Sequence, residues 1–195
     1  HTELEDLCKS CNLCSLAKNR TNTVFSSGPI PAKIMAIGEA PGEEENLQGK
    51  PFVGEAGLLL EKIFDSINIK LREDLYITNL LKCHPPDNRT PLPEEIKSCR
   101  NYLLAQIQLV QPKIIILIGN SAFQNILQVK TSISNARGNW YKIKVNYMSE
   151  DLYLMPVFHP SYLLQNSSKK PDSPKWLTWQ DFKEIKAALD FYKNK

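Results

Sequence analysis

Three polar side chains and one aromatic ring stand where they could form a binding site. Glu39, Asn79 and His159 each lie at or directly after the end of an apolar stretch typical of a buried strand. The carboxyl ends of parallel strands meet at one edge of a sheet, so we expect these side chains to lie close together. Together with the ring of Phe52, they could stack a flat ring and read its hydrogen-bonding edge. Each residue alone would more often be structural, and their joint placement carries the hypothesis.

Five cysteines form the second chemical pattern. Cys8, Cys11 and Cys14 are spaced as C-x2-C-x2-C, close enough for their thiolates to face one metal centre. Cys83 and Cys99 follow much later in the chain. An odd number of cysteines without a secretory signal argues against a disulfide framework and favours metal or cluster chemistry. The alternative is that they are small buried hydrophobic residues. At this point iron–sulfur and zinc sites both fit.

The elements that must position these residues alternate between strand and helix patterns. This alternation predicts an α/β fold, a three-layer αβα sandwich around a mostly parallel four-stranded sheet. Alternating residues also predict a hairpin strand within 138–147. The expected core strands are 33–38, 75–81, 113–118 and 152–158, and the expected helices are 55–68, 93–111, 121–128 and 178–193.

An acidic loop follows the first expected strand. Pro41-Gly42 constrains its backbone, and three glutamates follow at positions 43–45, where a charge run most often forms a solvated turn before a helix. A second loop, 51–54, then places Phe52 just ahead of a helix. The combination predicts that this stretch contributes one wall of the site.

Length and composition indicate an ordinary globular protein. The chain has 195 residues, of which 42% are hydrophobic and 23% charged, and we expect a single domain spanning 1–195. No run of eighteen apolar residues occurs, and the first residues do not resemble a signal peptide, so we expect an intracellular, cytoplasmic monomer that does not enter a membrane. A formal net charge of +3 permits nucleic-acid binding without indicating it.

Three segments carry a family resemblance. GEAPGEEENLQGKPFVGEAGLLL, YITNLLKCHPPDNRTP and HPSYLL, together with the N-terminal cysteines, closely resemble the family 4 uracil-DNA glycosylases, which contain an iron–sulfur cluster. The resemblance covers roughly residues 8–192. It implies a DNA repair enzyme that flips uracil out of single- or double-stranded DNA, hydrolyses its N-glycosidic bond and leaves an abasic site. Repair or replication proteins are candidate partners.

The resemblance also implies a [4Fe–4S] cluster. Its ligands would be Cys11, Cys14, Cys83 and Cys99, and the cluster would tie the N-terminal segment to residues 83–99. Both Cys8/Cys11 and Cys11/Cys14 have the required spacing, and the downstream Leu16 and Arg20-Thr21 match the family pattern that selects the second pair. Cys8 is then an extra thiol.

Roles in the uracil site follow from the same resemblance. Phe52 would stack on the flipped base, and Asn79 would read its edge, with Gly38 and Ala40 also in the uracil-binding pocket. His159 would donate to uracil O2. Glu39 is our choice for holding the attacking water, with Glu45 as the alternative. Family 1 enzymes carry an aspartate where this chain has Ala40, so that role does not transfer.

Contacts with DNA are expected from a second group of residues. Leu163 and Leu164 would form the wedge that fills the vacated base stack, unless one of them belongs to the core. Ser161 and Arg89 are expected to contact the DNA backbone, and Lys169, Lys170 and Lys175 are further candidates for phosphate contacts. The rival hypothesis is an iron–sulfur electron carrier or a non-catalytic DNA-binding module, which fits the cysteines equally well but gives no reason for the polar residues to meet.

Overall fold

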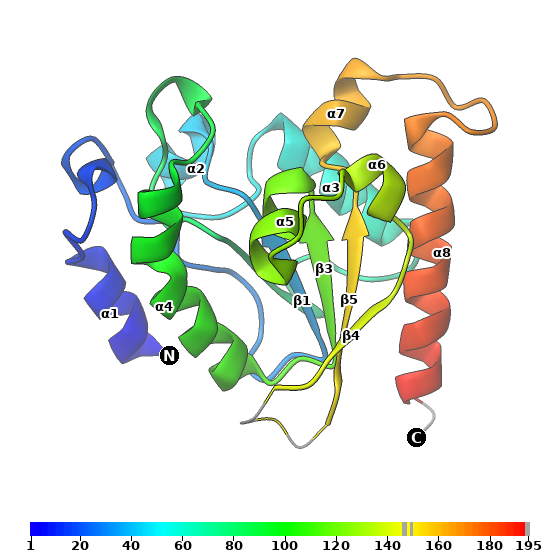
Figure 1. Ribbon diagram of the computed structural model, residues 1–195, viewed down its shortest axis with the longest axis horizontal. Coiled ribbons are helices and arrows are strands. Elements are labelled where there is room, and N and C mark those ends of the chain that lie inside the picture. The colour runs from blue at the N-terminus through cyan, green and yellow to red at the C-terminus, as the bar shows by residue number, and fades with distance from the viewer. Residues whose placement is uncertain (146–147, 149, 194–195) are drawn as a thin grey trace.

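A central β-sheet organises the protein. The computed structural model describes residues 1–145, 148 and 150–193. Five strands lie in the order β2-β1-β3-β5-β4. Four are parallel, and β4 pairs antiparallel with β5 at one edge (Figure 1). The strands are β1 (Ile34–Gly38), β2 (Leu75–Asn79), β3 (Ile114–Ile118), β4 (Tyr141–Ile143) and β5 (Leu152–Val157).

The prediction of a four-stranded sheet was wrong, because the sheet has a fifth strand, β4, at its edge. The hairpin segment expected within 138–147 contributes three residues, and they pair with β5 and so extend the same sheet. Positions 146 and 147 of that prediction lie outside the described residues. Each of the strands β1, β2 and β3 has five residues, and all of them are buried, as expected for parallel strands that are covered on both faces.

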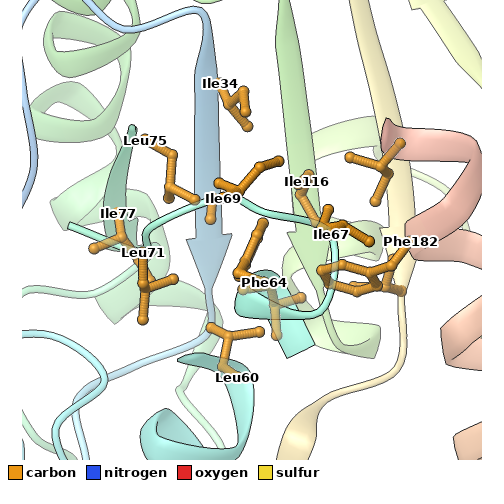
Figure 2. Packing of buried hydrophobic residues seen from close by; sticks show 14 of the residues in the cluster. Ile34, Leu60, Phe64, Ile67, Ile69, Leu71, Leu75, Ile77, Ile116 and Phe182 are labelled. Carbon is orange, nitrogen blue, oxygen red and sulfur yellow. The ribbon is translucent and has the colours of Figure 1, made fainter. Parts of the chain in front are cut away.

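Helices cover both faces of the sheet, which confirms the predicted αβα sandwich. On one face, α3 (Glu55–Asp65) and α8 (Pro174–Lys193) pack their apolar residues against the strands. Figure 2 shows Leu60 and Phe64 of α3 and Phe182 of α8 in this cluster. The rings of Phe64 and Phe182 are in contact, with centroids 5.0 Å apart. On the other face, α4 (Pro93–Val110), α5 (Asn120–Leu127) and α6 (Ile133–Ala136) contribute to a second cluster.

Shorter elements surround the ends of the sheet. At the N-terminus, α1 (Thr2–Lys9) lies beside α4 (Figure 1) and is followed by a 3-10 turn, Ser15–Lys18. The acidic loop begins α2 (Glu43–Gln48), and the segment after β5 begins α7 (Pro160–Gln165). A second 3-10 turn covers Pro86–Asn88. Among the described helices, none combines the length and apolarity that crossing a membrane requires.

Candidate functional site

A cavity of about 450 Å³ lies at the carboxyl ends of the parallel strands. We call it the sheet-edge pocket. Its lining includes the residues predicted from the strand ends and loops: Glu39, Ala40, Glu45, Phe52, Asn79, Arg89, His159 and Ser161. The structure therefore brings together side chains that are up to 122 positions apart in the chain, between Glu39 and Ser161. It also adds residues that sequence reasoning did not place there: Pro85, Asn88, Asn120 and Ser121.

Asn79 forms the polar floor of this pocket. The residue is only 2% exposed, and its carboxamide oxygen Oδ1 is buried without a hydrogen-bond partner among the described residues. Gly38 pairs with Asn79 across β1 and β2. A Cβ atom at Gly38 would lie 2.3 Å from Asn79 Oδ1 and 2.6 Å from Phe52 Cζ, so only glycine leaves room for both side chains. A buried acceptor without a partner is costly unless a ligand supplies the donor.

Phe52 is held in an unusual backbone conformation. Its φ angle is +54°, in the left-handed region that non-glycine residues rarely adopt. The Arg72 guanidinium donates to the Phe52 carbonyl at 2.6 Å, and the helical Gly57 allows the Phe52 backbone to pass where a Cβ atom would clash. Such strain persists only where surrounding contacts enforce it. The enforced conformation presents the ring to the pocket, with its centroid 6.3 Å from that of His159.

His159 lies between β5 and α7, and its hydrogen bonds define which ring nitrogen carries the proton. Its Nδ1 accepts a hydrogen bond from the Ser161 backbone N–H at 3.2 Å, and the Ser161 hydroxyl lies 2.7 Å from the same atom. Because a backbone N–H can only donate, Nδ1 is the acceptor, and the proton of the neutral ring sits on Nε2. Burial lowers the pKa of His159 to about 4, against a smaller opposing effect of Glu45. The ring is thus a neutral donor near pH 7.

The two candidate carboxylates differ in their partners. Glu45 Oε1 accepts from the backbone N–H groups of Val53 and Gly54, each at 2.9 Å, and its Oε2 accepts from Gly42 at 3.1 Å. These bonds join the start of α2 to the loop that carries Phe52. Glu39 also lines the pocket, and no hydrogen bond or ion pair engages its carboxylate in the part of the chain that the structure describes. Only Glu39 therefore has both oxygens available.

Leu163 and Arg89, both expected to contact DNA, are engaged within the protein. Leu163 is 1% exposed and belongs to the interior, because α7 turns this face inward toward α3. It is therefore not accessible as a wedge in this structure, whereas Leu164 is partly exposed. Arg89 lies at the pocket, but its guanidinium pairs with Glu95 at 2.6 Å and leaves less of its charge for a phosphate. Ser161 is exposed at the pocket.

The five cysteines line one small cavity. This cysteine cavity, about 20 Å³ in volume, is bounded by α1, the following turn, the segment after β2 and α4, and all of Cys8, Cys11, Cys14, Cys83 and Cys99 line it. Burial raises the pKa of Cys8 to about 12 and that of Cys99 to about 11, although Lys82 opposes both shifts. Among the described residues, no group of three or more potential ligands already stands in metal-binding geometry.

The donor set nevertheless suits a thiophilic centre. Five sulfur atoms from four separate segments converge on one cavity, and no carboxylate or imidazole lines it. Arg20 donates to the Cys83 sulfur at 3.4 Å, which favours the thiolate form. Thiolates are the ligands of iron–sulfur clusters and of many zinc sites. The residues present therefore fit the group that the sequence resemblance implies.

Comparisons with known proteins agree with this geometry. The family model of the uracil DNA glycosylase superfamily matches residues 25–183. The chain is 44% identical over 163 residues to the type-4 uracil-DNA glycosylase of Thermotoga maritima, covering 83% of this chain and 82% of that protein. It is 38% identical to that of Archaeoglobus fulgidus (90% and 86%) and 40% identical to that of Saccharolobus solfataricus (95% and 85%). The chain belongs to the uracil-DNA glycosylase superfamily and, within it, to the type-4 group.

Proposed function

We propose that this enzyme flips uracil out of DNA into the sheet-edge pocket and hydrolyses its N-glycosidic bond, leaving an abasic site. The observation that carries the proposal is the buried, unpartnered Oδ1 of Asn79 on the pocket floor, beside the rings of Phe52 and His159. A flat base with an N–H donor would satisfy that acceptor. Extruding such a base from a duplex costs about a few kcal/mol, which the pocket contacts must offset.

Asn79 would distinguish uracil from cytosine. Its carboxamide offers one acceptor and one donor, which match the N3–H and O4 of uracil. Cytosine has an unprotonated N3 and an exocyclic amine at these positions, so both contacts would be mismatched. Phe52 would stack on the base face, a contact worth on the order of 1–3 kcal/mol. Discrimination then arises because the wrong base leaves buried polar groups unpaired.

His159 would stabilise the departing base. Cleavage of the glycosidic bond leaves negative charge on uracil, including O2. A neutral imidazole with its proton on Nε2 can donate to that oxygen without first taking up a proton from solvent. The Ser161 backbone N–H fixes the ring through Nδ1, so the donor is already oriented before the base arrives.

Glu39 would hold the attacking water. The positive charge that develops on the sugar favours a carboxylate nearby, and the unengaged oxygens of Glu39 can accept a hydrogen bond from water. Glu45 has a different role in this proposal. It connects three backbone N–H groups and so keeps the loop around Phe52 in place. Gly38 leaves room for the side chains of Asn79 and Phe52, and Ala40 lines the pocket.

The DNA would approach along α7 and the loops around the pocket. Leu164, partly exposed on α7, is our candidate for the side chain that fills the vacated base stack. Ser161 at the pocket rim can donate to a backbone phosphate, and Arg89 contributes positive charge while it remains paired with Glu95. The exposed Lys169 and Lys170 lie just beyond α7.

The cysteine cavity would hold a [4Fe–4S] cluster through Cys11, Cys14, Cys83 and Cys99. When bound, the cluster supplies four metal–thiolate links that connect the N-terminal segment, the loop after β2 and α4. The chain's own contribution is to bring these segments together and to exclude water. Because the loop after β2 starts directly behind Asn79, the link also stabilises the floor of the sheet-edge pocket.

Uracil release from a defined oligonucleotide tests the proposal. We expect free uracil and an abasic site from single- and double-stranded DNA carrying one uracil, and no base release from the matching cytosine oligonucleotide. Asn79→Ala should abolish most of the release while the visible absorption and iron content stay unchanged. A coloured, iron-containing protein that binds DNA but releases no uracil would instead support an electron carrier or a non-catalytic DNA-binding module.

A further inference from the structure

Lys82 is a fully buried lysine between the two cavities. It follows β2 by three residues and precedes Cys83, and it is only 1% exposed. It lines the cysteine cavity but not the sheet-edge pocket. Burying an ammonium group is costly unless it is hydrogen-bonded and charge-compensated, so a lysine at this position requires an explanation.

The hydrogen bonds of Lys82 point toward the uracil-reading residue. Its Nζ donates to the backbone carbonyl of Asn79 at 2.6 Å and to Thr78 Oγ1 at 2.7 Å. Thr78 in turn donates to the Phe25 carbonyl at 2.7 Å, so the end of β2 is fixed on two sides. The Asn79 carbonyl and its side chain share one Cα atom, and a bond that fixes the carbonyl restricts where the carboxamide can point.

On its other side, Lys82 faces the cysteine cavity. No carboxylate lies within ion-pair distance of Nζ in the described chain. The Cys99 sulfur accepts a hydrogen bond from the Lys82 backbone N–H. The ring of Phe25 lies 6.0 Å from Nζ. Lys82 is thus held by the cysteine site and hydrogen-bonded to the residue that reads the base.

We infer that Lys82 is a positioning residue for uracil recognition: its side-chain nitrogen, through its hydrogen bonds to the Asn79 carbonyl and Thr78 Oγ1, holds the end of β2 so that the Asn79 carboxamide points into the sheet-edge pocket. This inference rests on the proposed function. It assigns Lys82 no contact with DNA or with the base, because Lys82 does not line the pocket. Its effect must therefore pass through Asn79.

Lys82→Met is the central variant, because it keeps the length of the side chain and removes its donors and charge. The measurement is the ratio of affinities for two otherwise identical oligonucleotides, one with an uncleavable 2′-fluoro-deoxyuridine and one with 2′-fluoro-deoxycytidine. We expect this ratio to fall about tenfold, with the affinity for the cytosine strand unchanged. Lys186→Met on α8, whose ammonium pairs with Asp190 away from the pocket, is the matched control and should leave the ratio unchanged.

A double-mutant cycle with Asn79→Ala separates positioning from general loosening of the fold. If Lys82 acts through Asn79, then Lys82→Met lowers the ratio in the wild-type background and has almost no further effect in Asn79→Ala. Equal factors in both backgrounds would overturn the inference, because they would mean that Lys82 acts independently of Asn79. An unchanged ratio in Lys82→Met itself would overturn it as well.

Thr78→Val covers the case in which Lys82→Met does not fold. It removes one of the two acceptors of Nζ and retains the lysine, so we expect a drop of about threefold in the ratio. Thr178→Val is its control, since Thr178 is also buried but bonds Pro174 within α8. Equal ratios for these two variants would contradict the inference.

The binding ratio tests the role of Lys82 and the release of uracil tests the proposed function, so either proposal can fail without the other. The ratio is measured on DNA that cannot be cleaved, so it reports base recognition even if the wild-type chain released no uracil. Wild-type chain that prefers the uracil analogue without releasing uracil would overturn the proposed hydrolysis and leave Lys82 testable. Wild-type chain that releases uracil, combined with an additive double-mutant cycle, would overturn only the role of Lys82.

Discussion

The sheet-edge pocket and the cysteine cavity lie on either side of the same strand end but are built differently. In the pocket, protein hydrogen bonds already hold both rings: Ser161 fixes His159, Arg72 fixes the Phe52 backbone, and Glu45 fixes the loop that carries Phe52. In the cysteine cavity, burial opposes ionisation of the thiols, and the pKa of Cys8 rises to about 12. The polypeptide alone orients these pocket groups, whereas burial disfavours the thiolates of Cys8 and Cys99 unless a bound group compensates them.

This difference predicts that variants in the pocket and variants in the cysteine cavity change different properties of the protein. A side chain that the pocket already orients contributes to the reaction with little change of structure, so its loss should lower the rate and spare stability. A cysteine whose ionised form depends on a bound group contributes to folding, so its loss should lower stability first. Lys82 touches both regions, through its bond to the Asn79 carbonyl and its place in the cysteine cavity.

The largest effect is expected for His159→Ala. It removes the oriented donor to uracil O2, and we expect the single-turnover rate of uracil release to fall about 10²- to 10³-fold. Iron content and thermal midpoint should stay close to wild type, since the cysteine cavity is untouched. His1→Ala is the control, because His1 bonds Ser26 and Tyr76 and neither it nor these partners line the pocket. Equal rates in these two variants would remove His159 from the mechanism.

The paired glutamates give the next test. Glu39→Gln should lower the single-turnover rate about 10²-fold without changing stability, because its carboxylate has no protein partner to lose. Glu45→Gln should lower the free energy of unfolding by about 1–3 kcal/mol, because it weakens three backbone contacts. Rates come from rapid mixing and stabilities from denaturant titration. A normal rate for Glu39→Gln, with a large loss in Glu45→Gln, would transfer the water-holding role to Glu45.

Cysteine variants test the other side of the comparison. Cys14→Ser should lose the visible absorption and iron and lower the free energy of unfolding by about 2 kcal/mol, while the rate changes less than in His159→Ala. Cys8→Ser should keep its iron, although Cys8 is buried in the same cavity. Iron analysis and thermal unfolding of both variants are the measurements. Loss of iron in Cys8→Ser with retention in Cys14→Ser would show that the ligand assignment is wrong.

The strand ends were predictable because buried parallel strands have an unmistakable pattern. Continuous apolar runs followed by Glu39, Asn79 and His159 were sufficient to place three side chains at one edge, and all three line the pocket. The edge strand was assigned to a separate hairpin, because three alternating residues at Tyr141–Ile143 carry too little pattern to indicate which sheet they join.

Other features depend on contacts that no local pattern records. Lys82 begins a proline-rich segment, where the sequence predicts an ordinary solvated lysine. It is buried because the end of β2 packs against the cysteine-bearing segments. Leu163 and Leu164 are adjacent and equally apolar, and only the docking of α7 on α3 decides which one turns inward. The bonds of Glu45 to Val53 and Gly54 likewise join residues eight and nine positions away.

The smallest effect is expected from pH, and it tests whether the pocket is prepared without a charge. Burial lowers the pKa of His159 from 6.5 to about 4, so the unfolded chain binds a proton first as the pH falls. The corresponding stability is complete above the unfolded value and is lost as the pH drops from about 6.5 toward 4. Between about pH 7.5 and pH 5, wild type should lose on the order of 1–2 kcal/mol more unfolding free energy than His159→Ala.

The rate of uracil release should not depend on the protonation of His159. Because the folded ring stays neutral well below pH 6.5, single-turnover uracil release should show no step that His159 causes between about pH 5.5 and pH 8. A rate profile with a midpoint near 6.5 that disappears in His159→Asn would mean that the ring titrates in the folded enzyme like an exposed histidine. The Ser161 hydrogen bond to Nδ1 would then not hold the Nε2–H tautomer, and the contrast between a pocket that the polypeptide already prepares and a cavity whose burial disfavours thiolates would lose its main support.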